Sequence, residues 1–356
     1  MIAALADLAE DEVFDLVVVG SGAAGLAAAL VAALEGGRVL LVERTEWLGG
    51  TTALSAATTW VPCNRHAASV NPDDDRAAAA RRLDGVVGDH APRALREAFL
   101  DAGPSAIDRL ERDSEVRFRP YATHPDYEQQ VAGATLRGRA LEPLPFDGRR
   151  LGPLLGRIRP PIPEFTLFGG MMVDRTDIGH LLKIGRSFAS TLHAAGILAR
   201  YGLDRLAGRR GSRLVMGNAL VGRFLVSLAT RDVTVLTETE VEGLGTGTTG
   251  VEAVTLTSGA ARRTVATRLG VVDAAGGFNR HPTRRAAFLP APTPPWSPAA
   301  PGHTGAMQDH ALGLGARFSS GEDQPAFWAP VSVRRRADGT AAGVPHVVLD
   351  RAPPGT

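Results

Sequence analysis

Three glycines and one acidic residue near the N-terminus have the types and spacing that can hold a pyrophosphate and a sugar. The glycines belong to the run Gly20-Ser21-Gly22-Ala23-Ala24-Gly25, directly after the apolar segment Leu16–Val19. Gly20 lets the chain turn sharply, Gly22 lets the backbone approach a phosphate, and Gly25 lets a helix pack closely on a strand. Glu43 follows Gly25 by 18 residues (43 − 25), where a carboxylate can accept hydrogen bonds from ribose hydroxyls. This spacing predicts a dinucleotide site.

The same segment indicates the elements that must position these residues. Leu16–Val19 predicts a strand buried on both faces of a parallel sheet. Residues 23–35 predict a helix, whose unpaired N–H groups and positive dipole end would face the phosphates. Gly36-Gly37 ends that helix, and residues 38–42 predict a second parallel strand with Glu43 at its tip. We therefore expect an α/β fold, a Rossmann-like domain built on a parallel sheet.

A second match to G-x-G-x-x-G, at Gly245, Gly247 and Gly250, has a different context. Residues 233–241 predict a strand before it, and residues 251–257 alternate apolar and polar side chains as another strand would. Because no helix follows, we interpret this match as the loop of a β-hairpin excursion rather than as a second nucleotide site.

Composition excludes several other classes of protein. The 356-residue chain has a formal net charge of +1, which provides no general attraction for nucleic acid. Its one cysteine, Cys63, rules out an internal disulfide and fits a reducing, cytoplasmic location. Residues 1–15 are acidic and lack the basic start of a secretory signal. Residues 16–34 carry no charge, but a β-branched run followed by glycines predicts a strand and a turn rather than a transmembrane segment.

A loop rich in glycine and threonine follows Glu43 directly. It reads Arg44-Thr45-Glu46-Trp47-Leu48-Gly49-Gly50-Thr51-Thr52. Amides of the two glycines can approach a phosphate, and either final threonine can donate a hydrogen bond to it. The stretch resembles the ribose acid and x-x-x-G-G-[ST]-[ST] pattern of the flavoprotein family that includes fumarate reductase, succinate dehydrogenase and 3-ketosteroid Δ1-dehydrogenase. The resemblance implies that the dinucleotide is FAD.

Two later segments resemble the same family. Residues 233–241 are similar to the strand whose backbone contacts the adenine, with Val241 at the matching position, and Ala275-Gly276-Gly277 is similar to the return of the chain to the flavin. Residues 53–60 contain neither histidine nor cysteine, so we expect FAD to be held non-covalently. The cofactor-binding residues that we predict are Gly20, Ser21, Gly22, Ala23, Ala24, Gly25, Glu43, Arg44, Gly49, Gly50, Thr51, Thr52, Val241, Ala275, Gly276 and Gly277.

Three further segments resemble the ketosteroid dehydrogenases within this family. They are Trp60-Val61-Pro62, Pro125-Asp126-Tyr127 and Gly138-Arg139-Ala140-Leu141-Glu142-Pro143. The resemblance implies that Tyr127 assists a catalytic tyrosine, and the alternative is a loop aromatic that packs on the surface. The chemistry would be removal of the acidic proton beside a ketone by a base, while the flavin takes a hydride. A second phenol favours the phenolate by hydrogen bonding to it.

Residues 165–212 form an excursion that is longer than in typical ketosteroid dehydrogenases. Within it, residues 177–210 have a helical pattern, with apolar side chains near one face at Ile178, Leu181, Leu182, Phe188 and Leu192. Two interpretations stay open: a solvated helical excursion that covers the core, and a weak peripheral contact with a membrane surface.

The nine histidines show no spacing typical of metal ligands, so we expect no metal site. His303 lies in Gly302-His303-Thr304-Gly305, which resembles the family's G-x-[NH]-[TS]-G loop near the flavin. The resemblance implies a contact with substrate or cofactor, and a role in helix entry is the alternative. We expect Cys63 to be a small buried residue rather than a flavin attachment point.

We expect two domains. Residues 1–290 would form the FAD-binding domain with its excursions, and residues 291–356 would begin an α+β substrate domain. The resemblance implies that the principal catalytic tyrosine and a last flavin-binding stretch would follow position 356. We therefore expect the chain to be C-terminally incomplete and poorly active alone.

The function that we predict is FAD-dependent dehydrogenation of a CH–CH bond beside a ketone, in a steroid-like or other small apolar substrate. Nothing in the sequence indicates a second nucleotide domain, so electrons would leave to an external acceptor. Fumarate-like reduction of an activated double bond is the first alternative, and the Trp60-Val61-Pro62 and Pro125-Asp126-Tyr127 segments favour the ketone over it. A non-catalytic binding protein is the second alternative, which the intact glycine run disfavours.

Overall fold

The computed structural model of the chain describes residues 1–207, 210–248, 250–318 and 326–346. These residues form two compact units. Unit 1 consists of the described residues of 1–54, 149–171 and 225–356, and unit 2 consists of those of 55–148 and 172–224. The predicted start of a substrate domain at residue 291 stays a prediction.

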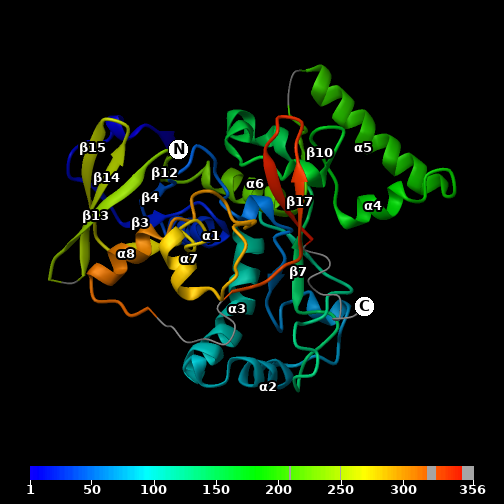
Figure 1. The fold of residues 1–356 in the computed structure, drawn as a ribbon, viewed down its shortest axis with the longest axis horizontal. Helices are drawn as coiled ribbons and strands as arrows, with labels where there is room; N and C mark the ends of the chain where they lie inside the picture. The colour runs from blue at the N-terminus through cyan, green and yellow to red at the C-terminus, as the bar shows by residue number, and fades with distance from the viewer. Residues whose placement is uncertain (208–209, 249, 319–325, 347–356) are drawn as a thin grey trace. The chain divides into compact units, whose positions relative to one another are not determined.

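The centre of unit 1 is a parallel sheet with the strand order β1-β12-β4-β3-β16 (Figure 1). Its strands are β1 (Ile2–Ala3), β3 (Leu16–Val19), β4 (Val39–Val42), β12 (Val233–Leu236) and β16 (Val271–Asp273). In β3 the neighbours Val17 and Val18 are both fully buried, although their side chains point to opposite faces. The predicted α/β fold with a parallel sheet is therefore confirmed.

Helix α1 (Ala23–Leu34) connects β3 to β4 and packs on both strands. It begins directly after Gly22, and Gly36, with a φ of +84°, turns the chain away from its C-terminal end. Leu26, Ala29 and Leu30 are fully buried on its inner side. The predicted strand, glycine turn, helix and second strand are all present.

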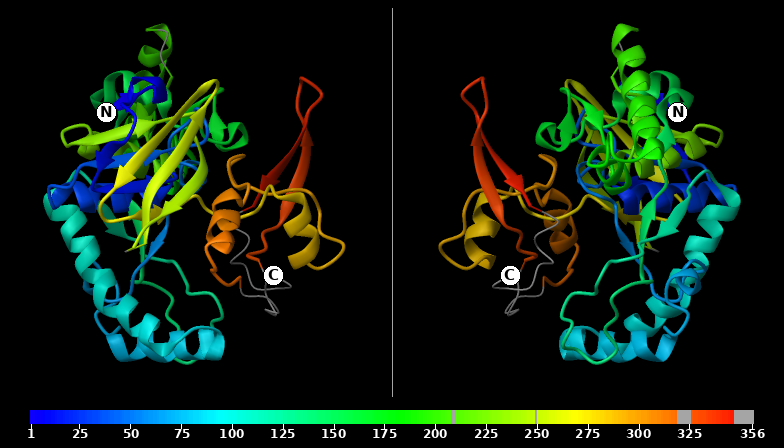
Figure 2. Two further views of the ribbon diagram at one scale, coloured as in Figure 1. Left: turned by 90° about the vertical axis from the view of Figure 1, so that its left-hand side faces the viewer. Right: turned by 90° about the vertical axis from the view of Figure 1, so that its right-hand side faces the viewer.

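The second sheet of unit 1 has the order β13-β14-β15-β2, in which β2 pairs in parallel with the antiparallel meander β13-β14-β15 (Figure 2). Its strands are β2 (Glu12–Phe14), β13 (Glu240–Thr246), β14 (Val251–Ser258) and β15 (Ala261–Thr267). Thr246 pairs with Val251, which confirms the predicted hairpin around the second glycine match. The single strand expected at 233–241 was wrong: β12 ends at Leu236 and β13 begins at Glu240, because Glu238 adopts a φ of +53° that no strand continues through.

The C-terminal part of unit 1 is mixed α and β. It contains α7 (Pro282–Phe288), α8 (Ala306–Gly313) and the antiparallel hairpin of β17 (Val331–Arg335) and β18 (Ala341–Pro345), red in Figure 2. The short strand β9 (Thr166–Leu167) also belongs to unit 1.

Unit 2 has a small sheet with the order β5-β7-β6, together with helices. Its elements are β5 (Thr59–Trp60), α2 (Arg76–Val87), α3 (Arg93–Asp113), β6 (Phe118–Pro120), β7 (Ala140–Pro143), β8 (Phe146–Asp147), α4 (Arg175–Leu181), α5 (Phe188–Leu206) and β11 (Arg213–Leu214). The division between the units falls within β10 (Met171–Met172) and α6 (Met216–Leu228).

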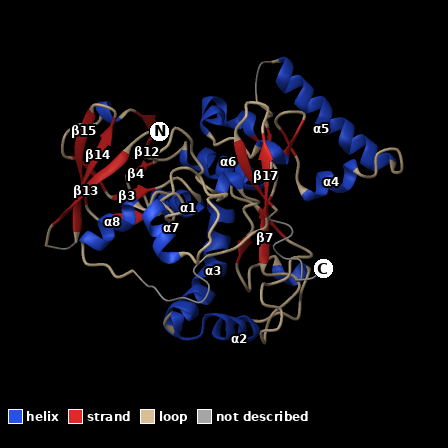
Figure 3. Cartoon of the chain, viewed as in Figure 1, coloured by secondary structure: helices blue, strands red, loops and turns tan. Residues whose placement is uncertain are grey.

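The helical excursion is present as two helices rather than one. Figure 3 shows α4 and α5 as separate helices joined by a loop, in which Gly185 has a φ of +76°. The predicted pattern extended to 210, and its residues 208–209 lie outside the described residues. In the part of the chain that the structure describes, no helix has both the length and the apolar character needed to cross a membrane.

Candidate functional site

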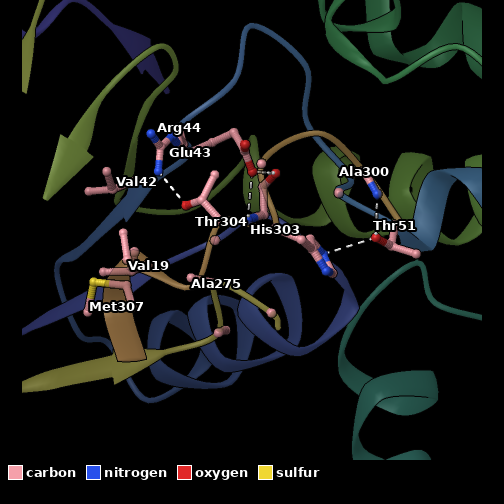
Figure 4. Close-up of a pocket in the computed structure, with 18 of the residues that line it drawn as sticks. Val19, Val42, Glu43, Arg44, Thr51, Ala275, Ala300, His303, Thr304 and Met307 are labelled. Atoms are coloured by element: carbon pink, nitrogen blue, oxygen red, sulfur yellow. Dashed lines mark hydrogen bonds between the residues drawn. The ribbon is translucent and has the colours of Figure 1, made fainter. Parts of the chain in front are cut away.

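A cavity of about 240 Å³ opens in unit 1 at the carboxyl ends of β3 and β4. The ends of parallel strands are where ligands of open α/β sheets bind. Its wall is completed by the start of β13, by residues 274–276 and by the segment around 300–307 (Figure 4). Among the predicted cofactor residues, all line this cavity except Gly25, Gly49 and Gly277.

The glycines of the first turn have different neighbours. A Cβ atom on Gly25 would lie 1.8 Å from the carbonyl oxygen of Gly20, and one on Gly20 would lie 2.3 Å from that of Ala274. A Cβ atom on Gly22, in contrast, would have only the hydroxyl of Thr52 nearby, at 3.8 Å. The fold therefore requires glycine at 20 and 25, and it leaves open space at 22.

Glu43 is buried at the tip of β4, with 6% of its surface exposed. One carboxylate oxygen accepts hydrogen bonds from the N–H and the hydroxyl of Ser21, at 3.1 and 2.5 Å. The other accepts from the N–H and the hydroxyl of Thr45, at 2.9 and 2.7 Å. These four donors tie the glycine turn to the following loop. A ribose bound at Glu43, as predicted, would donate to a carboxylate that already accepts these four hydrogen bonds.

The loop after β4 is fastened to the glycine turn at two further points. Ser21 is fully buried, and its hydroxyl oxygen accepts the N–H of Gly49 at 3.0 Å. The hydroxyl of Thr52 accepts the N–H of Ala23 at 2.9 Å, which satisfies one of the unpaired donors at the start of α1. Gly50, with a φ of +48°, faces Gly22: its Cβ atom would lie 3.5 Å from the Gly22 Cα. Two backbones without side chains thus border this part of the cavity.

His303 lines the cavity beside Thr51, as Figure 4 shows. The Thr51 hydroxyl accepts the N–H of Ala300 at 2.9 Å and lies 3.0 Å from Nε2 of His303. Nδ1 of His303 lies 3.4 Å from the side-chain oxygen of Asn279, so both ring nitrogens have a hydrogen-bond partner. Burial lowers the pKa of His303, with Glu43 opposing and Arg280 and Arg159 adding to the effect. The ring is therefore neutral near pH 7.

Close packing explains one of the glycines near His303. A Cβ atom on Gly276, which has a φ of +82°, would lie 2.6 Å from the imidazole ring. Gly277 and Gly49 do not line the cavity.

Sequence reasoning missed several residues of the cavity. Arg159, Thr239 and Glu240 line it, together with most of the segment from Ala300 to Met307. Arg44 was predicted, and its guanidinium joins two of these segments by an ion pair with Glu240 at 3.1 Å and a hydrogen bond to Thr304 at 2.5 Å. The resemblance around His303 was a usable signal for the later segment, whereas Arg159 stands in no recognisable pattern.

The predicted catalytic residue Tyr127 belongs to unit 2 and is 42% exposed. Its neighbour Asp126 is buried, and accepts the indole N–H of Trp60 at 2.6 Å and a guanidinium N–H of Arg139 at 2.9 Å. Arg139 also donates to both carboxylate oxygens of Asp74, at 2.8 and 2.5 Å. Burial opposes its charge, but the two carboxylates raise the pKa of Arg139.

We call this group the Trp60 cluster: Trp60, Asp74, Arg82, Asp126 and Arg139. Arg82 completes it with an ion pair to Asp126 at 3.3 Å. The cluster joins all three segments that resemble ketosteroid dehydrogenases, and it fixes the chain next to Tyr127.

In the residues that the structure describes, no group of three or more histidine, cysteine or acidic side chains could hold a metal ion. Cys63 is half-buried, and burial raises the pKa of its thiol, as expected of an unreactive side chain.

Comparisons with known proteins give one consistent result. The family described as FAD binding domain matches residues 15–354. A 4-oxocyclohex-2-ene-1-carboxylate 5-dehydrogenase of Sinomonas cyclohexanicum is 34% identical over 336 residues, which are 94% of this chain and 56% of that protein. A 3-oxosteroid 1-dehydrogenase of Mycolicibacterium smegmatis is 31% identical over 89% of this chain and 56% of its own length.

A solved structure is also similar. It is the 3-ketosteroid Δ1-dehydrogenase of Sterolibacterium denitrificans in complex with 1,4-androstadiene-3,17-dione, with a TM-score of 0.81 and 28% identity over 94% of this chain and 59% of that chain. The chain spans about half the length of the relatives that it matches.

Proposed function

The chain belongs to the family of FAD binding domain flavoproteins, and we propose that the cavity of unit 1 holds FAD without a covalent bond. The glycine turn and the 49–52 loop would hold the pyrophosphate, Glu43 the ribose and Val241 the adenine. Ala275, Gly276 and Gly277 would lie towards the flavin.

Gly22 carries this proposal. Its φ is −67°, which any residue can adopt, and a Cβ atom there would meet nothing closer than 3.8 Å. Packing therefore explains Gly20 and Gly25 but not Gly22. A phosphate close to the backbone would explain it, because a methyl group would occupy that space.

Gly22→Ala tests the proposal directly. We expect the variant to lose no more than about 1 kcal/mol of its free energy of unfolding, because alanine can adopt the φ of Gly22 and is only a poorer N-cap than glycine. Its affinity for FAD should fall by about tenfold or more. Flavin fluorescence titration measures the affinity, and urea unfolding measures the stability.

Gly156→Ala is the matched control, because this glycine also belongs to unit 1, has open space around its Cβ position and lies outside the cavity. It should leave FAD affinity unchanged. If Gly22→Ala binds FAD as tightly as the original chain, the cavity is not a pyrophosphate site.

We infer that the whole protein dehydrogenates a CH–CH bond beside a ketone in an apolar ring substrate. The names of both relatives describe dehydrogenation of a ring that carries an oxo group. When bound, FAD would supply the hydride acceptor. The residues of this chain would hold the cofactor, and the neutral His303 would border it without adding a charge. Electrons would leave to an external acceptor.

Tyr127 would assist removal of the proton beside the ketone. A phenol that hydrogen-bonds to a catalytic base stabilises the deprotonated form of that base. Support comes from the Trp60 cluster, in which Trp60 and Arg139 hold the carboxylate of Asp126, the residue before Tyr127.

Anaerobic mixing of the FAD-loaded whole protein with 4-androstenedione or succinate separates the candidate reactions. We expect the ketone to bleach the flavin absorbance and succinate to leave it unchanged. Tyr127→Phe should slow the bleaching without changing FAD affinity. Bleaching by succinate alone would contradict the proposed reaction.

We also propose that α5 makes a weak peripheral contact with a membrane surface. Phe188, Leu192, Leu203 and Leu206 lie on one side of the helix and are between 63% and 87% exposed, whereas Ala194, Ile197 and Tyr201 are buried on the other. The exposed cations Lys183 and Arg186 precede the helix. Binding to anionic vesicles at low salt is expected, and its absence would contradict this contact.

The lone Cys63 supports a cytoplasmic location, which we also propose.

A further inference from the structure

Arg159 is a buried cation in the wall of the cavity, with 8% of its surface exposed. Its position is fixed by backbone contacts with the loop after β4. Leu48 and Ile158 form a parallel bridge, and the N–H of Arg159 donates to the Leu48 carbonyl at 2.9 Å. A segment more than a hundred residues downstream is thus held beside Glu43 and Thr45.

The guanidinium of Arg159 is only partly satisfied. One terminal nitrogen donates to the Thr45 hydroxyl at 2.7 Å. The Nε–H is buried and finds no acceptor within residues 1–207, 210–248, 250–318 and 326–346. Burial lowers the pKa of Arg159, and the nearby Glu43 and Glu46 oppose that change.

A buried N–H without an acceptor is rare in folded proteins, because it has lost its hydrogen bond to water and gained none. The position of Arg159 and the chemistry of its side chain both indicate an oxygen-rich ligand. Thr45 and Glu43 lie at the tip of β4, the end that receives the adenosine of a dinucleotide. Arginine is suited to phosphate and ribose oxygens because its N–H groups keep a fixed geometry.

We propose that Arg159 is a cofactor-binding residue whose guanidinium donates to an oxygen of the ribose or pyrophosphate in the adenosine half of FAD. This inference rests on the proposed binding of FAD in the cavity. Arg159 would thereby add a positive charge to a site whose phosphate donors are otherwise the backbone N–H groups of the glycine turn, the threonine hydroxyls and Arg44.

A purely structural role makes a different prediction. Arg159 would then serve only to balance the charge of Glu43 and to hold Thr45. In that case its removal would affect FAD only through Glu43, and neutralising Glu43 would remove the effect.

The first experiment compares Arg159→Met with the original chain, using FAD and ADP as ligands in calorimetric titrations. We expect both affinities to fall by the same factor, about tenfold to a hundredfold, as for a lost hydrogen bond to a charged donor. Arg268→Met is the control, since Arg268 pairs with Asp15 at 2.7 Å outside the cavity, and it should bind both ligands normally. A loss for FAD without a loss for ADP would overturn the adenosine assignment.

The second experiment repeats Arg159→Met in a Glu43→Gln background. The loss of affinity should persist there, and its disappearance would show that Arg159 acts only through Glu43. Arg159→Lys keeps the positive charge and so guards against misfolding of the methionine variant. It should weaken both ligands by a smaller factor, and full affinity would overturn the proposal.

The two proposals fail differently. If the original chain binds neither FAD nor ADP, the proposed function fails. If the original chain binds both and Arg159→Met binds them equally well, only the role of Arg159 fails.

Discussion

The cavity of unit 1 and the Trp60 cluster of unit 2 are both polar and buried, but they treat their hydrogen-bonding groups differently. In the Trp60 cluster, both carboxylate oxygens of Asp74 and both of Asp126 accept N–H groups of the protein. In the cavity, the Nε–H of Arg159 has no acceptor in the described part of the chain, and Gly22 has open space beside it. The carboxylates of the Trp60 cluster are thus satisfied by the protein itself, whereas the cavity keeps an unsatisfied donor and open space for a ligand.

This difference changes how the motifs should be interpreted. The three segments that resemble ketosteroid dehydrogenases meet in one ion-pair cluster through Trp60, Asp126 and Arg139. A resemblance at these positions therefore indicates a shared scaffold next to Tyr127. It provides no information about the shape of a substrate.

The largest effect should come from Arg139→Met in the Trp60 cluster. Arg139 is 1% exposed and lies between two buried carboxylates, and removal of one partner of a buried ion pair costs about 3–5 kcal/mol. Urea unfolding should show this loss. FAD affinity, measured on folded protein, should not change, because the cluster is complete without a ligand.

Arg112→Met provides the control for that measurement. Arg112 pairs with Asp113 at 2.9 Å, but its side chain is 67% exposed, and exposed pairs contribute little to stability. Equal losses in the two variants would contradict the distinction between the cluster and the surface pairs. A marked loss of FAD affinity in Arg139→Met would contradict the distinction between the cluster and the cavity.

Ser21→Ala should have an intermediate effect, and it should change both properties. The fully buried hydroxyl donates to Glu43 and accepts the N–H of Gly49, so alanine leaves that N–H without an acceptor. We expect a loss of about 1–3 kcal/mol in urea unfolding, together with weaker FAD binding. Ser105→Ala, at an exposed position of α3, should do neither. Normal stability in Ser21→Ala would show that the turn and the loop are held by other contacts.

The sequence was sufficient to predict those elements whose residue pattern lies within one continuous segment. The strand at 16–19, the glycine turn, the helix and Glu43 follow one another, and each has its own pattern of apolar or glycine residues. The break between β12 and β13 could not be predicted in this way, because it depends on a positive φ at Glu238, a residue type with no preference for it.

Arg159 shows the limit for the site itself. It reaches the cavity through the bridge between Leu48 and Ile158, and a contact across that much chain leaves no periodic pattern in the sequence. The two units are likewise interleaved along the chain. Local patterns thus predicted the residues of the glycine turn, and tertiary contacts added the rest of the wall.

The smallest expected effect concerns the pH dependence that His303 gives to the cavity. Burial holds the pKa of His303 below its ordinary value of about 6.5, so the unfolded chain takes up the proton at a higher pH than the folded chain does. The stability from this residue is therefore complete above about pH 6.5 and is lost as the pH falls towards the lowered pKa. His303→Asn removes the titration, so its urea midpoint should fall less than that of the original chain between pH 7.5 and 5.5. Equal falls of the two midpoints over that range would show that His303 does not carry this pH dependence.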